Sequence, residues 1–160
     1  MYWFRRKVDQ IKRVIDFLPI IWKGYDFDYR YSIDLFKHSL KRQADFMESD
    51  YAHTMSAPRH AKEIRTFIKL LDKVYEEEYA MEYHDKMEEL YGKHTFDFVE
   101  IDTKDENGDP YYTLESSYEN QTEETNEVET KLLRESIKKQ NKAHRILWSY
   151  LEHKIQGWWD

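Results

Sequence analysis

The stretch that decides the fold is the C-terminal run 133–160, LRESIKKQNKAHRILWSYLEHKIQGWWD. Its apolar residues recur at steps of three or four, or at sums of these, which places them on one face of a helix. They are Leu133, Ile137, Leu147, Leu151, Ile155 and Trp158. No proline or glycine interrupts the run before Gly157. The pattern predicts a helix of about seven turns around which the other helices pack.

Length and composition indicate one helical domain, residues 1–160. Charged residues make up 36% of the chain, which suits long helices with solvated outer faces. The absence of cysteine excludes disulfides, thiol nucleophiles and Cys-ligated metals. The N-terminus lacks the apolar core of a secretory signal, and no apolar run is long enough to span a bilayer. We therefore expect a soluble, cytoplasmic protein.

Charge is distributed unevenly, although the net charge is only −7. Residues 1–75 hold 15 Lys and Arg against 10 Asp and Glu, residues 76–130 hold 3 against 19, and residues 131–160 hold 7 against 3. The N-terminal and C-terminal segments are therefore basic, and the segment between them is acidic. Two interpretations stay open: the segments neutralise each other within the fold, or they form a basic cleft for an anionic ligand with the acidic segment outside.

The N-terminal segment predicts a short amphipathic helix over residues 8–18, ended by Pro19. The apolar face of this helix consists of Val8, Ile11, Val14, Ile15 and Leu18. Trp3 and Phe4 beside Arg5-Arg6-Lys7 would also suit a membrane surface. Because such a helix has only about three turns and the chain behind it is acidic, we expect it to pack in the core.

Two more helices are predicted over residues 29–47 and 58–91, with Pro58 in the first turn of the second. Alternating β-prone residues on both sides of Asn107-Gly108 then predict a hairpin over residues 95–114. The acidic residues 115–129 are either a mobile connector or the first turns of the last helix. The expected fold class is therefore mainly α, a bundle of about four helices with a small β-hairpin insertion before the last helix.

No sequence motif assigns a catalytic site. The chain has no nucleophile elbow, phosphate-cradling loop, dinucleotide fingerprint or His-Glu-x-x-His sequence, and none of its seven histidines lie four residues apart. We therefore expect no metal, no cofactor and no enzymatic activity. Duplex nucleic acid is not expected as a ligand either, because the chain is acidic and has no continuous basic face.

Basic residues lie beside polar interruptions on the core-facing sides of the predicted helices. They are Lys41 and Arg42 on the second helix, Lys62, Arg65 and Lys69 on the third, and Lys142, His144 and Arg145 on the last. If these helices are neighbours, the cations can pair with phosphate and nearby rings can stack a base. The predicted ligand-binding set is Arg42, Lys62, Arg65, His144, Arg145, Trp22, Tyr25 and Trp148. The alternative is that the 32 carboxylates neutralise the cations.

Three short motifs give the chain a resemblance to small helical proteins of tailed bacteriophages. They are Trp22 with Asp26-Phe27-Asp28, Lys62-Glu63-Ile64-Arg65, and Ala143-His144-Arg145 leading to Trp158-Trp159-Asp160. The resemblance covers most of the chain except the hairpin. It implies a phage origin and a location in the host cytoplasm, and it brings no catalytic residues.

The leading hypothesis is a non-enzymatic anti-defence protein that sequesters a nucleotide immune signal, either a cyclic nucleotide or an ADP-ribose-type compound. The alternative is an inhibitor that binds a host defence protein through its acidic residues 76–130. A third hypothesis is an enzyme acting on nucleotides, with His38 or His144 and a carboxylate as acid and base. We expect a homo-oligomer under all three, because aromatic-rich helices and a lone hairpin favour a partner chain. A membrane partner is not expected.

Overall fold

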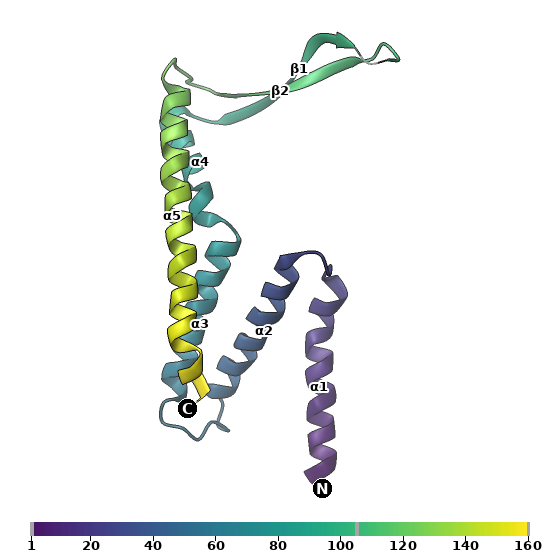
Figure 1. Cartoon of the computed structure of the whole chain (residues 1–160), viewed down its shortest axis with the longest axis vertical. Coiled ribbons are helices and arrows are strands. Elements are labelled where there is room, and N and C mark those ends of the chain that lie inside the picture. Colours follow the sequence, from purple (N-terminus) through teal and green to yellow (C-terminus); the bar gives the residue numbers. More distant parts are fainter. Residues whose placement is uncertain (1, 105, 160) are drawn as a thin grey trace. The chain divides into compact units, whose positions relative to one another are not determined.

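The computed structural model describes residues 2–104 and 106–159. In this part of the chain, five α-helices and one antiparallel hairpin are followed by a 3₁₀ turn (Figure 1). The helices are α1 (Tyr2–Lys23), α2 (Tyr29–Met47), α3 (Ala57–Tyr75), α4 (Glu78–Tyr91) and α5 (Thr125–Lys154), the strands are β1 (His94–Lys104) and β2 (Pro110–Tyr118), and the 3₁₀ turn is η1 (Gln156–Trp159). The expected fold class is confirmed.

The chain forms two compact units. Unit 1 comprises Met1–Glu76 and His144–Asp160, and unit 2 comprises Glu77–Ala143. The last part of α5 therefore belongs to unit 1 and its first part to unit 2. Of the C-terminal Trp-Trp-Asp motif, Trp158 is described fully, whereas the side chain of Trp159 and all of Asp160 lie outside the described residues.

The central helix of unit 1 is α3. It buries seven residues, which are Ala57, His60, Ala61, Ile64, Phe67, Leu71 and Val74. Leu40 and Ala44 of α2 and Leu147 and Leu151 of α5 are also buried in this unit. The expectation that the other helices pack around the C-terminal helix is therefore wrong for unit 1. Helix α3 takes that place because its buried residues repeat with helical spacing along its whole length, from Ala57 to Val74.

The helix expected over residues 58–91 is two helices, because the chain breaks at the glutamates 76–78. The backbone N–H of Glu76 closes α3 on the carbonyl oxygens of Asp72 and Val74, and Glu77 is left-handed with φ 57°. Three adjacent negative charges at this point oppose the negative end of the helix dipole, which favours termination. The break explains why five helices form where about four were expected.

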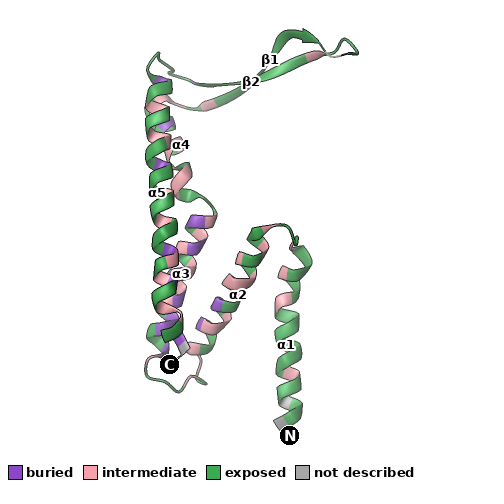
Figure 2. Ribbon diagram, in the orientation of Figure 1, coloured by how far each residue is buried: buried purple, intermediate pink, exposed green. Residues whose placement is uncertain are grey.

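The expectation of a short, core-packed N-terminal helix is also wrong. Helix α1 runs through Pro19 to Lys23, and the N–H of Gly24 closes it on the carbonyl of Ile20. Pro19 removes one backbone donor, but the following residues still form helical bonds. None of the described side chains of α1 is buried, as Figure 2 shows. Among the helices of residues 2–104 and 106–159, none combines the length and apolar character that crossing a membrane requires.

In unit 2, the hairpin forms around Asn107-Gly108 as expected, with Gly108 at φ 90° in the turn. The strands are longer than predicted, since His94 pairs with Tyr118 at the base. Tyr118 is buried there, and its ring stacks on His94 with centroids 4.4 Å apart. Thr125 already begins α5, so the second interpretation of residues 115–129 holds for their C-terminal part.

The left-handed backbone at Glu77 yields a stability prediction. A non-glycine residue in this conformation is strained, so Glu77→Gly should raise the free energy of unfolding by about 1 kcal/mol. Urea denaturation followed by circular dichroism measures it. The matched control is Glu76→Gly, where φ is −82° and glycine should instead lower the free energy of unfolding by roughly 0.5–1 kcal/mol. Equal effects at both positions would contradict the assignment of strain to Glu77.

Candidate functional site

The candidate site is a cavity of about 460 Å³ in unit 1, between α2 and α3, with Ile20 of α1 at its edge. Its size falls within the range of small-molecule pockets in proteins. The lining residues are Ile20, Asp34, Lys37, His38, Lys41, Arg65, Ile68, Lys69 and Asp72. Four cationic side chains and an imidazole thus face two carboxylates and two isoleucines. This balance favours an anionic ligand with a small apolar part.

Both carboxylates of the lining are already paired with Lys37. Its Nζ atom lies 3.0 Å from Asp72 Oδ1 and 3.4 Å from Asp34 Oδ1. Burial alone would lower the pKa of Lys37, but the hydrogen bonds and charges of Asp72 and Asp34 outweigh it and raise that pKa. Lys37 therefore stays charged and offsets one of the two negative charges of the lining.

Arg65 is held by two carboxylates outside the lining. Its Nη2 donates to Asp45 Oδ1 at 2.8 Å, its Nε donates to Glu48 Oε1 at 2.9 Å, and Nη2 also pairs with Glu48 Oε2. Hydrogen bonds to Glu48 and then to Asp45 raise the pKa of Arg65. Its guanidinium is therefore largely neutralised before any ligand enters.

Lys41 and Lys69 are the cations of the lining that remain available. Within the part of the chain that the structure describes, neither makes a hydrogen bond or an ion pair. A third group lacks a partner in the same cavity: His38 Nε2 is buried and has no hydrogen bond to any described residue. Two unpaired ammonium groups and one unsatisfied imidazole nitrogen are a suitable set for an oxyanion such as phosphate.

The structure does not bring the eight residues of the predicted set together, and only Arg65 among them lines this cavity. Arg42 pairs with Asp16 of α1 and lies over the Phe17 ring, 5.8 Å from its centroid. Arg145 lines a different hollow, along α5. Lys62 is exposed on α3.

The rings and the histidine of the predicted set lie elsewhere in unit 1. Trp22 is 86% exposed, and Tyr25 packs against Phe27 with centroids 5.7 Å apart. Trp148 Nε1 donates to His144 Nε2 over 3.1 Å within α5. In the described residues, neither His38 nor His144 pairs with a carboxylate, and no three His, Asp or Glu side chains gather as metal ligands would.

No protein-family model, no curated protein and no solved structure matches this chain.

The residues that replace the predicted set had a signal in the sequence. Lys37 and Lys41 lie four residues apart on α2, and Arg65 and Lys69 lie four residues apart on α3. Such pairs share one helix face, so each pair indicated a basic strip. Lys41 and Lys69 were among the basic residues noted on the predicted helices but were not part of the predicted ligand-binding set. The rotation of each helix about its axis, which decides which cations face a neighbour, cannot be read from helical spacing alone.

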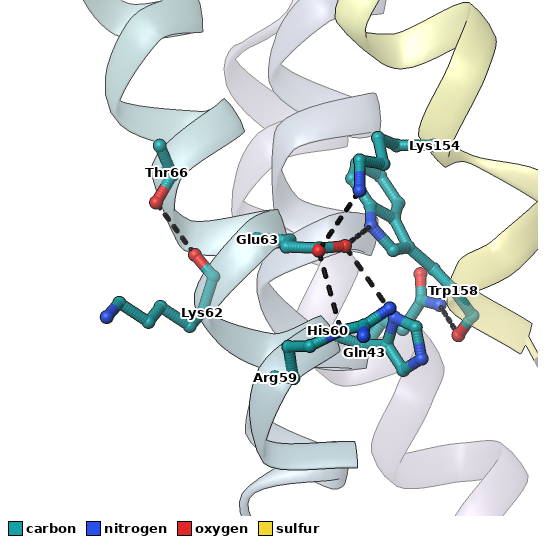
Figure 3. Close-up of polar contacts among 8 residues, drawn as sticks. All are labelled: Gln43, Arg59, His60, Lys62, Glu63, Thr66, Lys154 and Trp158. Atoms are coloured by element: carbon teal, nitrogen blue, oxygen red, sulfur yellow. Dashed lines mark hydrogen bonds and ion pairs between the residues drawn. The ribbon is translucent and has the colours of Figure 1, made fainter. Parts of the chain in front are cut away.

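Below the cavity on α3, Glu63 joins α3 to the C-terminal segment (Figure 3). Its carboxylate accepts from Lys154 Nζ and from Trp158 Nε1, both at 3.2 Å. Arg59 and His60 Nδ1 lie 3.7 Å from the same carboxylate. Lys62 points away from this cluster in Figure 3 and is therefore free of it.

The environment of Glu63 gives it a pH-dependent role in stability. Burial alone would raise the pKa of Glu63, but the hydrogen bonds from Lys154 and Trp158 outweigh it, so the pKa lies below its ordinary 4.5. A carboxylate with a lowered folded-state pKa stabilises the fold above its unfolded pKa, and the stabilisation is lost as pH falls through the folded value.

Glu63→Gln should therefore lower the free energy of unfolding at neutral pH by about 1–3 kcal/mol, because hydrogen bonds to a charged group are lost. The difference from the wild type should shrink as the pH falls through the lowered pKa of Glu63, because the protonated carboxyl is then neutral like glutamine. Urea denaturation at neutral pH and at a series of acidic pH values measures it. The control is Glu152→Gln, an exposed glutamate of α5 without a partner among the described residues. A loss that persists unchanged in acid would contradict the electrostatic account.

Proposed function

We propose that this chain is a non-enzymatic binding protein that takes up a small phosphate-bearing ligand, of the nucleotide class, in the α2–α3 cavity. The observation that carries the proposal is the pair of unpaired lysines, Lys41 and Lys69, beside the unsatisfied Nε2 of His38. Phosphate oxygens in the cavity would pair with the two ammonium groups. Ile20 and Ile68 offer apolar contact for the rest of the ligand.

The phosphate is the better supported half of this proposal. The described lining contains no aromatic ring other than the His38 imidazole, so base stacking would rest on His38 alone. Phe17 already packs edge-on against that imidazole, with centroids 4.6 Å apart, which holds the ring in place. Specificity for the phosphate group should therefore exceed specificity for the base.

The biological setting follows from the resemblance to small phage proteins. In that setting the protein acts in the host cytoplasm, and its role is the sequestration of a nucleotide immune signal. We also propose that the protein binds the ligand without chemically altering it. Recovery of intact nucleotide after denaturation of the complex, by mass spectrometry, tests that part separately.

The alternative, direct inhibition of a host protein through residues 76–130, is supported by one observation. The hairpin in this region exposes several large apolar side chains, with Phe98 76% exposed. A host protein captured by the wild type and lost by Phe98→Asp, in a chain that binds no nucleotide, would favour the alternative.

Calorimetric titration of the full chain tests the binding proposal. The probes are cyclic mononucleotides, cyclic dinucleotides, ADP-ribose and inorganic pyrophosphate. Lys41→Gln and Lys69→Gln should each weaken binding about tenfold, because each removes one charge-assisted contact to phosphate. Lys62→Gln is the matched control, an exposed lysine of α3 outside the cavity, and should leave affinity unchanged.

The proposal fails if no probe binds at tens of micromolar. It also fails if Lys62→Gln weakens binding as much as the two cavity variants, since binding would then reflect general positive charge.

A further inference from the structure

Helix α1 turns its main apolar stripe away from its neighbour. The stripe residues are Phe4, Val8, Ile11, Ile15, Leu18 and Trp22, spaced alternately by four and three. All but Val8 are exposed, from 49% for Leu18 to 86% for Trp22. The contact with α2 instead uses another side of α1, through Asp16 with Arg42 and Phe17 with His38. Apart from the half-buried Val8, the stripe therefore stays exposed, on a helix with no buried side chain among its described residues (Figure 2).

The hairpin of unit 2 also exposes a row of apolar side chains. The register places Phe98 opposite Leu114, and Phe96 and Tyr112 lie on the same face. All four of these side chains are more than half exposed. A two-stranded sheet is marginal in water unless a helix or further strands cover one face. This face, here called the Phe96–Phe98 face, therefore needs a cover.

The helix and the hairpin that carry these two surfaces have opposite net charges. Helix α1 holds six Lys and Arg against two Asp, a balance of +4. Residues 94–118 hold one Lys against seven Asp and Glu, a balance of −6. On the Phe96–Phe98 face itself, the register places Glu100 opposite Tyr112. The opposite net charges of the helix and the hairpin favour their association.

The lengths of helix α1 and of the hairpin also agree. The 22 residues of α1 span about 33 Å at about 1.5 Å per residue. The 11 residues of β1 span about 36 Å at about 3.3 Å per residue. One helix can therefore cover one face of the hairpin from end to end.

We propose that the protein self-associates through these surfaces, with α1 of one copy packed on the Phe96–Phe98 face of a second copy. A two-fold dimer makes this contact twice and covers all four surfaces. Pairing of α1 with α1 is disfavoured because it brings +4 against +4. An anionic lipid surface would cover α1, but it would leave the hairpin exposed and would repel its carboxylates.

A complementation experiment on the full chain tests the proposal. Ile15→Asp disables α1, and Phe98→Asp disables the hairpin; each should weaken self-association about thirtyfold or more, as loss of a central contact does. In sedimentation velocity, the wild type should double its mass from 19.8 kDa, and each variant should stay monomeric at the same concentration. An equimolar mixture of the two variants should form dimers again, because it keeps one intact α1 and one intact hairpin.

The matched control is Phe46→Asp, the same kind of change at a 58% exposed site on α2 outside both surfaces, which should dimerise like the wild type. Circular dichroism of each variant checks that the helices remain. Four outcomes overturn the proposal. They are a wild type that is monomeric at every concentration, a Phe98→Asp variant that still dimerises, a mixture that stays monomeric, and a monomeric wild type that co-sediments with phosphatidylglycerol vesicles through α1.

Discussion

Unit 1 depends on the joint between Glu63 and the C-terminal segment. One partly buried carboxylate receives the Lys154 ammonium and the Trp158 indole, while the Trp158 ring packs edge-on against Phe67. Gln43 of α2 adds a hydrogen bond to the Trp158 carbonyl at 3.3 Å. Three segments far apart in sequence therefore meet at Trp158. Burial of a charge is tolerable here because every part of the carboxylate is hydrogen-bonded or paired.

This joint also sets the orientation of α2 and α3 on which the cavity depends. The basic side chains around the cavity fall into two groups, those that pair with carboxylates and those that do not. Arg42 and Arg65 are neutralised by acids on neighbouring turns or helices, and Lys37 is neutralised by the two acids of the lining. Lys41 and Lys69 lack such partners among the described residues. The intramolecular pairing that the sequence left open is thus real but incomplete, and the proposed ligand site lies where it is incomplete.

In unit 2, some charged and aromatic side chains have partners within the unit, whereas the apolar side chains of the hairpin are exposed. The apolar stripe of α1 is exposed in the same way. In unit 2, Lys139 pairs with Glu82 at 2.5 Å and lies 5.2 Å from the Tyr79 ring, so its charge is used locally. Tyr118 is buried at the base of the hairpin, and burial first, then Glu129, raises its pKa to about 12. Beyond that base the hairpin buries nothing on the described residues of either strand. Order within the hairpin therefore comes from its local hydrogen bonds, and its apolar side chains stay exposed.

The sequence by itself determined the elements whose causes lie within a few residues. The helical spacing around Leu147 and Leu151 and the Asn107-Gly108 turn depend on neighbours one turn away, so pattern alone predicted them. Only the tertiary structure decided which side of each helix meets which neighbour. Arg65 met Asp45 and Glu48, and Glu63 met Trp158, 95 residues away in sequence. Periodicity gives a helix its apolar stripe but not its rotation against other helices, and a charge pairs with whichever side chain that rotation brings within a few ångströms. For the same reason the stripe of α1 predicted a buried helix, although its residues are exposed apart from the half-buried Val8.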